Sequence, residues 1–170
     1  MICPHCGFEN YAGEEVCERC LHDLTQTDTT PRPKNEIHRS IIEDPVSRLN
    51  PPAHAVCSPE DPAADAIETM KSRRLGCVVV EEKKQPVGIF TERDVLMKVI
   101  GRPVDPKRAP VRSLMTSPVD SLKSTDSIAY ALNKMSIGGY RHIPIADDHG
   151  HVTGVISVRN ILQYLAKQIA

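Results

Sequence analysis

Apolar and polar positions follow a pattern that occurs twice between about residue 50 and residue 170. When Met70 is aligned with Met135, DPAADAIETM falls on DSIAYALNKM. Further along, PVGIFTERDVLMKVI falls on VTGVISVRNILQYLA. An internal repeat is stronger evidence of the architecture than any local sequence signal, so both copies are expected to share one fold.

Each copy predicts the same order of elements. A short extended segment (55–57 or 119–122) precedes a helix whose apolar residues recur at helical spacing. Two strands follow, CVVVEE and VGIF in copy one and HIPIAD and TGVIS in copy two, and a second amphipathic helix closes each copy. The helix-forming apolar positions are Ala63, Ala66, Ile67 and Met70 in copy one, and Ile128, Ala131, Leu132 and Met135 in copy two.

The predicted fold class is therefore α/β (α+β), with two β-α-β-β-α repeats. One repeat alone leaves a sheet face uncovered, and two repeats packed face to face bury both faces. We therefore expect one globular pair related by a pseudo-twofold axis, with repeat 1 over residues 50–104 and repeat 2 over residues 112–170.

The segment before the repeats has two parts. Residues 1–24 form a small cysteine-rich module, and residues 25–49 form a linker that begins with the polar stretch TQTDTTPRPKNE. Within that linker, IHRSIIEDPVSRLN has apolar residues spaced for a short helix that covers part of the paired domain.

Four cysteines in the first module form two Cys-x-x-Cys pairs, Cys3 with Cys6 and Cys17 with Cys20. Two such turns facing each other give a tetrahedral four-sulfur site, which suits Zn²⁺, with iron as the competing metal. A closed four-thiolate site has no position for water, so the predicted zinc is structural. Gly7 is expected to supply the left-handed backbone of the first turn.

Alternatives for this module stay open. His5 and His22 flank the cysteines and could substitute as ligands, and a redox Cys-x-x-Cys is a further reading. The module resembles the small zinc ribbons of many bacterial proteins, which bind protein or nucleic acid. Residues 1–30 hold six acidic residues and one arginine, a balance that disfavours phosphate backbones and favours a protein partner.

Composition narrows the function classes. The 170-residue chain is 40% hydrophobic, has a net charge of −1, lacks Trp and is only 4% aromatic, which disfavours a nucleic-acid stacking platform. No apolar run approaches a membrane span, and MICPHCG does not have the pattern of a signal peptide. A cytoplasmic protein, in which clustered thiols bind metal, is the expectation.

The repeats resemble a tandem pair of cystathionine β-synthase (CBS) domains, a Bateman module. The resemblance rests on GCVVVEEKKQPVGIFTERDVL in copy one and on MTSPVDSLKSTDSIAYALNKMSIGGYRHIPIADDHGHVTGVISVRNIL in copy two. It implies a regulatory module that binds an adenine nucleotide (AMP, ADP or ATP) and that associates as a homodimer through its CBS domains.

The resemblance also implies nucleotide-binding residues. Thr91 and Asp94 match the family's Thr/Ser-x-x-Asp motif, in which the helix start faces phosphate and the acid accepts the ribose diol. The same spacing also describes an ordinary capping box. In copy two the motif reads Ser157 and Asn160, and a neutral Asn grips a diol less well, so this second site is expected to be degenerate.

Two cations complete the predicted site. The resemblance implies that Arg141 and His142, just before a strand of copy two, contact the phosphates of a nucleotide. Asp94 of copy one would hold the ribose of the same nucleotide. Val56 is a candidate beside the adenine, and Thr116 matches a position beside the ligand. Each of the four can equally be a core, turn or solvated residue.

Catalysis is not expected, because the sequence has no matched nucleophile and base, no Walker loop and no open metal site. The leading hypothesis is a nucleotide sensor that signals to an unknown protein partner. A nucleic-acid-binding regulator that uses the ribbon, and an interaction module without a ligand, are the alternatives.

Overall fold

A computed structural model describes residues 3, 5–11, 14–24 and 35–168. The chain divides into two compact units, Met1–Lys34 and Asn35–Ala170, which are considered separately below. Residues 25–34, the first part of the predicted linker, lie outside the described residues.

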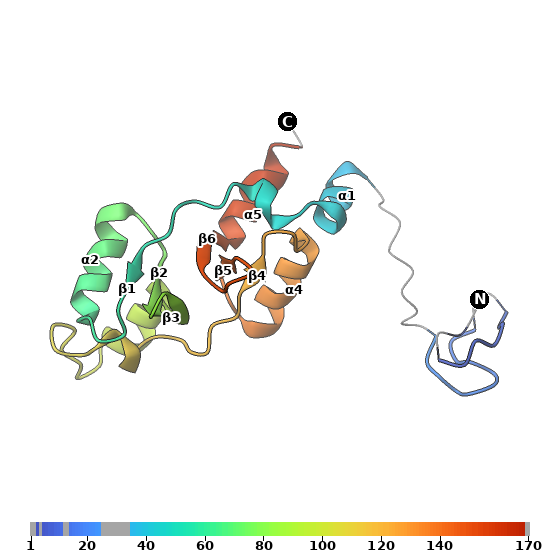
Figure 1. The fold of residues 1–170 in the computed structure, drawn as a ribbon, viewed down its shortest axis with the longest axis horizontal. Coiled ribbons are helices and arrows are strands. Elements are labelled where there is room, and N and C mark those ends of the chain that lie inside the picture. Colours follow the sequence, from blue (N-terminus) through green and yellow to red (C-terminus); the bar gives the residue numbers. More distant parts are fainter. Residues whose placement is uncertain (1–2, 4, 12–13, 25–34, 169–170) are drawn as a thin grey trace. The chain divides into compact units, whose positions relative to one another are not determined.

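The larger unit contains both repeats in the predicted order (Figure 1). The elements of repeat 1 are β1 (Val56–Cys57), α2 (Ala63–Arg73), β2 (Cys77–Glu82), β3 (Gln85–Thr91) and α3 (Glu92–Asp94), which continues as the π-helical turn η2 (Val95–Val99). Those of repeat 2 are β4 (Leu122–Lys123), α4 (Ile128–Gly138), β5 (His142–Ala146), β6 (Val152–Ser157) and α5 (Val158–Ala166). The mixed α/β fold class is confirmed.

Each repeat forms one three-stranded sheet, in the orders β1-β2-β3 and β4-β5-β6. The first strand of each sheet is parallel to the second, which is antiparallel to the third. Cys77 pairs with Thr91, and His142 pairs with Ser157. This register places the start of the second strand beside the residue that caps the closing helix.

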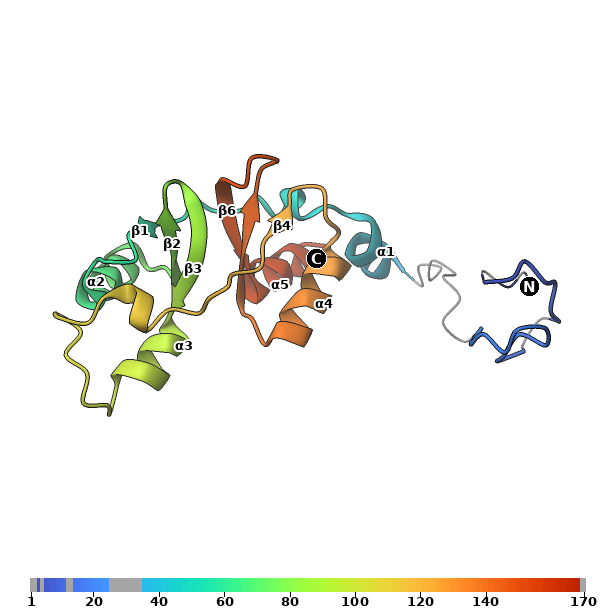
Figure 2. The ribbon, with the colours of Figure 1, turned by 60° about the horizontal axis from the view of Figure 1, so that its bottom comes forward.

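The two sheets pack face to face (Figure 2). Cys77, Val79 and Ile89 from repeat 1 form one buried cluster with Val155 of β6, and Val152 packs against it. Since both partners bury apolar strand faces here, neither repeat is a separate domain. Each repeat also has its own core beneath its first helix, which includes Ala63, Ala66, Val78, Val80 and Phe90 in repeat 1 and Ile128, Ala131, Ile143, Ile145 and Ile156 in repeat 2.

The segment that precedes repeat 1 belongs structurally to repeat 2. It forms α1 (Glu36–Glu43), capped by the Asn35 side chain, and a 3-10 turn η1 (Val46–Leu49), with α1 lying beside α4 (Figure 1). Val46 and Leu49 are buried in the core of repeat 2. The backbone N–H of Val46 donates to the carbonyl of Asp126, so the segment is also held by main-chain hydrogen bonds.

Two elements differ from the sequence-based expectation. The strand predicted over 119–122 is limited to β4, Leu122–Lys123, and residues 117–121 belong to the connection that precedes it. The closing helix of repeat 1, expected to be a regular amphipathic helix, is instead the three-residue α3 followed by the π-helical turn η2, and the backbone is extended at Ile100. Among the described residues, no helix combines the length and the apolar character needed to cross a bilayer.

Candidate functional site

The four cysteines of the smaller unit converge. One sulfur–sulfur distance joins Cys3 to Cys20 at 3.7 Å, and another joins Cys6 to Cys17 at 3.6 Å. All four Sγ atoms lie within 4.8 Å of one another. Cys3 and Cys17 are buried with Leu24, in a small apolar cluster that Phe8 joins.

Two matching turns bring the cysteines together. In the first, the N–H of Gly7 donates to the carbonyl of Cys3, and Gly7 has φ of +70°. In the second, the N–H of Leu21 donates to the carbonyl of Cys17, and Leu21 has φ of +58°. The left-handed backbone predicted at Gly7 is therefore present, and the second turn repeats it with a residue that pays a steric cost there.

Four sulfurs in this arrangement could hold a metal ion. Burial opposes ionisation of Cys17, yet the backbone N–H groups of Cys20 and Arg19 lower the pKa of its thiol to about 6. A thiolate at neutral pH is the form that coordinates metal. His5 and His22 stack on each other, with ring centroids 5.3 Å apart, and do not belong to the four-sulfur group.

In repeat 1, Thr91 and Asp94 form the capping box of α3. The Thr91 hydroxyl accepts from the N–H of Asp94, and the Asp94 carboxylate accepts from the N–H and the hydroxyl of Thr91 at 3.0 and 2.7 Å. Thr116 joins this group, because its hydroxyl donates to Oδ1 of Asp94 at 3.0 Å. The structure therefore unites three of the predicted nucleotide-binding residues.

A fourth group completes that cluster. The Nζ of Lys98 lies 2.7 Å from Oδ1 of Asp94. The same ammonium donates to the carbonyls of Leu114 and Met115 at 2.7 and 3.1 Å. Asp94 is buried, at 5% exposure, so its charge is balanced from inside the protein.

In repeat 2, Ser157 and Asn160 form the same capping box at the start of α5. Oδ1 of Asn160 accepts from the N–H and the hydroxyl of Ser157, at 2.8 and 2.6 Å. The position equivalent to Lys98 is Tyr164, whose hydroxyl donates instead to Oδ2 of Asp44. No described residue bonds to Nδ2 of Asn160.

A cavity of about 590 Å³ opens beside this second capping box. It lies between the repeats: repeat 1 contributes the end of α2, the start of β2 and Glu92, and repeat 2 contributes the starts of β5 and α5. Its lining comprises residues 52–54, 74–77, 141–142 and 157–160, with Glu92, Val155 and Leu162.

The lining is rich in positive charge. Arg74, Arg141 and Arg159 face the cavity with Glu92 as the acidic member. None of the three arginines forms an ion pair with another residue in the part of the chain that the structure describes. Burial lowers the pKa of His142, the Glu92 carboxylate opposes that shift, and Arg141 adds to it. The cavity thus offers hydrogen-bond donors to an anion.

The predicted site residues fall into two groups. Arg141 and His142 line the cavity with Ser157 and Asn160, whereas Thr91 and Asp94 are absent from that lining. The loop before β5 does approach the first capping box, because Nη1 of Arg93 donates to the carbonyl of Gly139 at 3.3 Å. The combination of Arg141 and His142 with Asp94 around one ligand stays a prediction.

Val56 lies in β1, at 48% exposure, and is not among the lining residues of the cavity. Four contributors to this region were not predicted from the sequence: Arg74, Glu92, Lys98 and Arg159. Lys98 had a readable signal, since it stands four residues after Asp94 on one helical face. Arg74 had no such signal in the sequence, because its position depends on its own left-handed backbone conformation at the end of α2.

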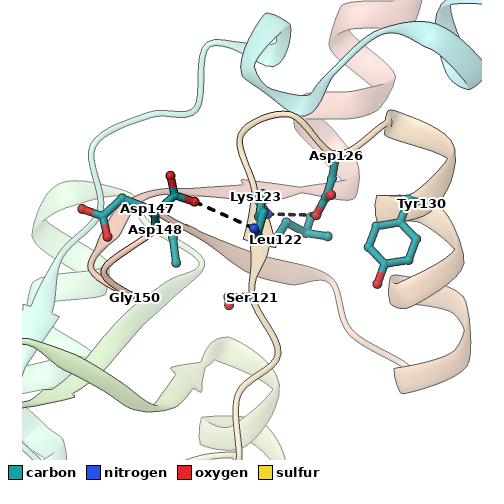
Figure 3. Close-up of a pocket in the computed structure, with 9 residues that line it drawn as sticks. Ser121, Leu122, Lys123, Asp126, Tyr130, Asp147, Asp148 and Gly150 are labelled. Atoms are coloured by element: carbon teal, nitrogen blue, oxygen red, sulfur yellow. Dashed lines mark hydrogen bonds and ion pairs between the residues drawn. The ribbon is translucent and has the colours of Figure 1, made fainter.

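Another cavity, of about 600 Å³, lies in repeat 2 between β4, α4 and the β5–β6 turn (Figure 3). Its carboxylates are already engaged. Asp126 accepts from the N–H of Lys123 at 2.8 Å, and Asp148 lies 3.8 Å from the Lys123 ammonium. Asp147 accepts from the N–H groups of His149 and His151 in its own turn. These contacts hold the three carboxylates in local turns and beside Lys123.

Known proteins resemble the larger unit. The uncharacterized protein MK0525 of Methanopyrus kandleri is 35% identical over 107 residues, which is 62% of this chain and 55% of that protein. A 17.7 kDa protein of Acidianus ambivalens is 33% identical over 111 residues, 65% of this chain and 66% of that protein. The chain thus spans between half and two thirds of the length of these relatives.

Among solved structures, the CBS domain protein PAE2072 from Pyrobaculum aerophilum, complexed with AMP, matches with a TM-score of 0.63 at 26% identity. The match covers 72% of this chain and 98% of that one. The family model of the CBS domain matches residues 41–101 and 111–167, well over half of the sequence. The chain belongs to the CBS-domain family, as a tandem pair preceded by a four-cysteine cluster.

Proposed function

We propose that the paired repeats bind an adenine nucleotide in the cavity beside Ser157 and Asn160, and that the protein is regulatory rather than catalytic. The observation that carries this proposal is the set of three arginines around one cavity between the repeats, none of which is ion-paired with another described residue. The AMP complex of PAE2072 supports the ligand class.

The chemistry of the lining suits the parts of such a ligand. Arg141 and Arg159 offer planar donor groups for phosphate, and the start of α5 adds its free N–H groups and the positive end of its dipole. Ala53, Leu75 and Val155 supply apolar surface against which a purine can pack. The volume of the cavity is in the range of small-molecule sites.

A sensor also needs a response. A nucleotide changes the protein only if it binds one arrangement of the repeats, or of two protomers, more tightly than another. We propose a homodimer formed through the CBS repeats and a protein partner that reads its state, in the cytoplasm. The acidic N-terminal module disfavours nucleic acid as that partner.

Zn²⁺ is the proposed occupant of the four-cysteine cluster. Four thiolates fit its preference for tetrahedral sulfur coordination, and a closed set of four gives it a structural role. A module of this size buries too little apolar surface to fold without such support, so the metal would hold it together.

A thermal-shift titration with AMP, ADP and ATP tests the nucleotide proposal. At ~100 times the dissociation constant, a ligand that binds only the folded state adds about 2.7 kcal/mol to the free energy of unfolding, so the midpoint should rise. Arg141→Met should abolish most of that rise. Arg108→Gln is the matched control, because Arg108 is exposed and does not line the cavity. If none of the three nucleotides raises the midpoint of the native chain, the proposal fails.

A further inference from the structure

The carboxylate of Asp94 has no acceptor capacity left for a ligand. Two oxygens offer about four lone-pair positions, and four donors occupy them. The N–H and hydroxyl of Thr91 donate to Oδ2, while the Thr116 hydroxyl and the Lys98 ammonium contact Oδ1. A ribose diol that needed this carboxylate would first have to displace one of these groups.

Lys98 is equally saturated. An ammonium has three N–H donors, and Lys98 faces three acceptors: Oδ1 of Asp94 and the carbonyls of Leu114 and Met115. Leu114 and Met115 precede Thr116, so the ammonium also ties the connection between the repeats to the first capping box. Removing Lys98 from this position would leave a buried carboxylate without its counter-charge.

Repeat 2 lacks this internal cation. Tyr164 stands where Lys98 stands in repeat 1, and its hydroxyl is bonded 2.7 Å away to Oδ2 of Asp44. Oδ1 of Asn160 is used by the capping box, so the remaining polar group of this cavity-lining side chain is its Nδ2 amide, which is a donor. The Arg141 and Arg159 side chains, which also line the cavity, are donors as well.

We infer that Lys98 is a built-in occupant of the first capping box, which closes the Asp94 carboxylate to a ligand and leaves one nucleotide site per chain, beside Asn160. This inference rests on the proposed function. It reverses the prediction from the sequence, in which Asp94 marks the intact nucleotide site and Asn160 the degenerate one. The open site selects an acceptor-rich, phosphate-bearing ligand, because the Arg74, Arg159 and Asn160 side chains that line it carry N–H donors.

Isothermal titration calorimetry with AMP tests the inference through stoichiometry. The native chain should bind one equivalent, and Asp94→Asn should bind one equivalent with an affinity within ~2-fold of native, since Asp94 is not used. This variant is expected to fold, because repeat 2 forms the same capping box with asparagine. Asn160→Leu should weaken binding at least ~10-fold.

Two substitutions of Lys98 isolate its role. Lys98→Met removes the charge at similar length and should expose a second, weaker equivalent, while Lys98→Arg should keep one equivalent. Circular dichroism checks that each variant is folded. If Lys98→Met is not folded, the stoichiometry and affinity of Asp94→Asn still decide the test.

Three results would overturn the inference: two equivalents in the native chain, a ~10-fold loss in Asp94→Asn, or one equivalent in a folded Lys98→Met chain. Each of these requires that AMP binds, so they differ from failure of the proposed function, in which the native chain gives no binding heat and no thermal shift.

Discussion

The imidazole of His142 in repeat 2 occupies the space in which a side chain on Gly76 of repeat 1 would begin. A β-carbon built on Gly76 would lie 2.6 Å from Nε2 and 2.8 Å from Cε1 of His142. Both residues line the cavity between the repeats. The absence of a side chain at residue 76 therefore lets His142 reach across the interface.

Gly76→Ala should displace the His142 ring and destabilise the protein by about 1 kcal/mol, a cost typical of modest overpacking. Urea unfolding measures this directly. The matched background is His142→Ala, in which the added methyl group has room and the same substitution should cost nothing measurable. An equal cost in both backgrounds would show that the two residues do not meet.

Acid should weaken the folded state through His142. Burial lowers the pKa of this imidazole below its ordinary value of 6.5, so the unfolded chain binds the proton more readily than the folded chain. The folded state has its full stability above the ordinary value and loses part of it as the pH falls from that value through the lower pKa of the folded state. His142→Gln should flatten the decline of the urea midpoint between about pH 7.5 and pH 5.5, and an unchanged slope would assign the decline to other groups.

Tyr164→Phe should loosen the attachment of the segment before repeat 1. The Tyr164 hydroxyl donates to Oδ2 of Asp44 at 2.7 Å, and Arg48 pairs with Oδ1 at 2.7 Å, so the lost bond leaves a buried carboxylate short of one donor. We expect a loss of about 1–2 kcal/mol in the free energy of unfolding. Tyr130→Phe is the control, because the Tyr130 ring is exposed and should tolerate the change.

Cys3→Ser should empty the proposed zinc site. Three thiolates and a hydroxyl bind Zn²⁺ far more weakly than four thiolates, so the zinc content should fall from about one per chain to near zero. Elemental analysis of the purified protein gives the ratio. Cys57→Ser should keep its zinc, since Cys57 lies in β1 of the other unit. Full zinc retention in Cys3→Ser would mean that Cys3 is not a ligand.

The repeat made most of the fold predictable. Strand and helix periodicities are local properties, and two copies in register confirm each other, so β2 and the first helices were placed closely from sequence. The Cys-x-x-Cys pairs likewise identified the four-sulfur cluster. The segment 36–49 was expected to cover part of the paired domain. That it packs on repeat 2 depends on the buried contacts of Val46 and Leu49, which no local sequence pattern encodes.

The candidate site was predicted less completely, for a physical reason. Arg141 and His142 stand beside Ser157 because β5 and β6 pair there, and they stand beside Gly76 because the sheets face each other. The first relationship follows from the repeat register, and the second depends on sheet packing. The role of Lys98 depends on a third relationship, the path of the 114–116 connection past α3, which only the folded chain reveals.

The most direct test of the account follows the backbone and side-chain amides by NMR while AMP is added. The account predicts large shifts at Ser157–Asn160, including the Nδ2 amide of Asn160, and little change at residues 114–116, which surround Lys98. Large shifts at 114–116 with none at 157–160 would contradict it, and so would a titration in which no amide moves.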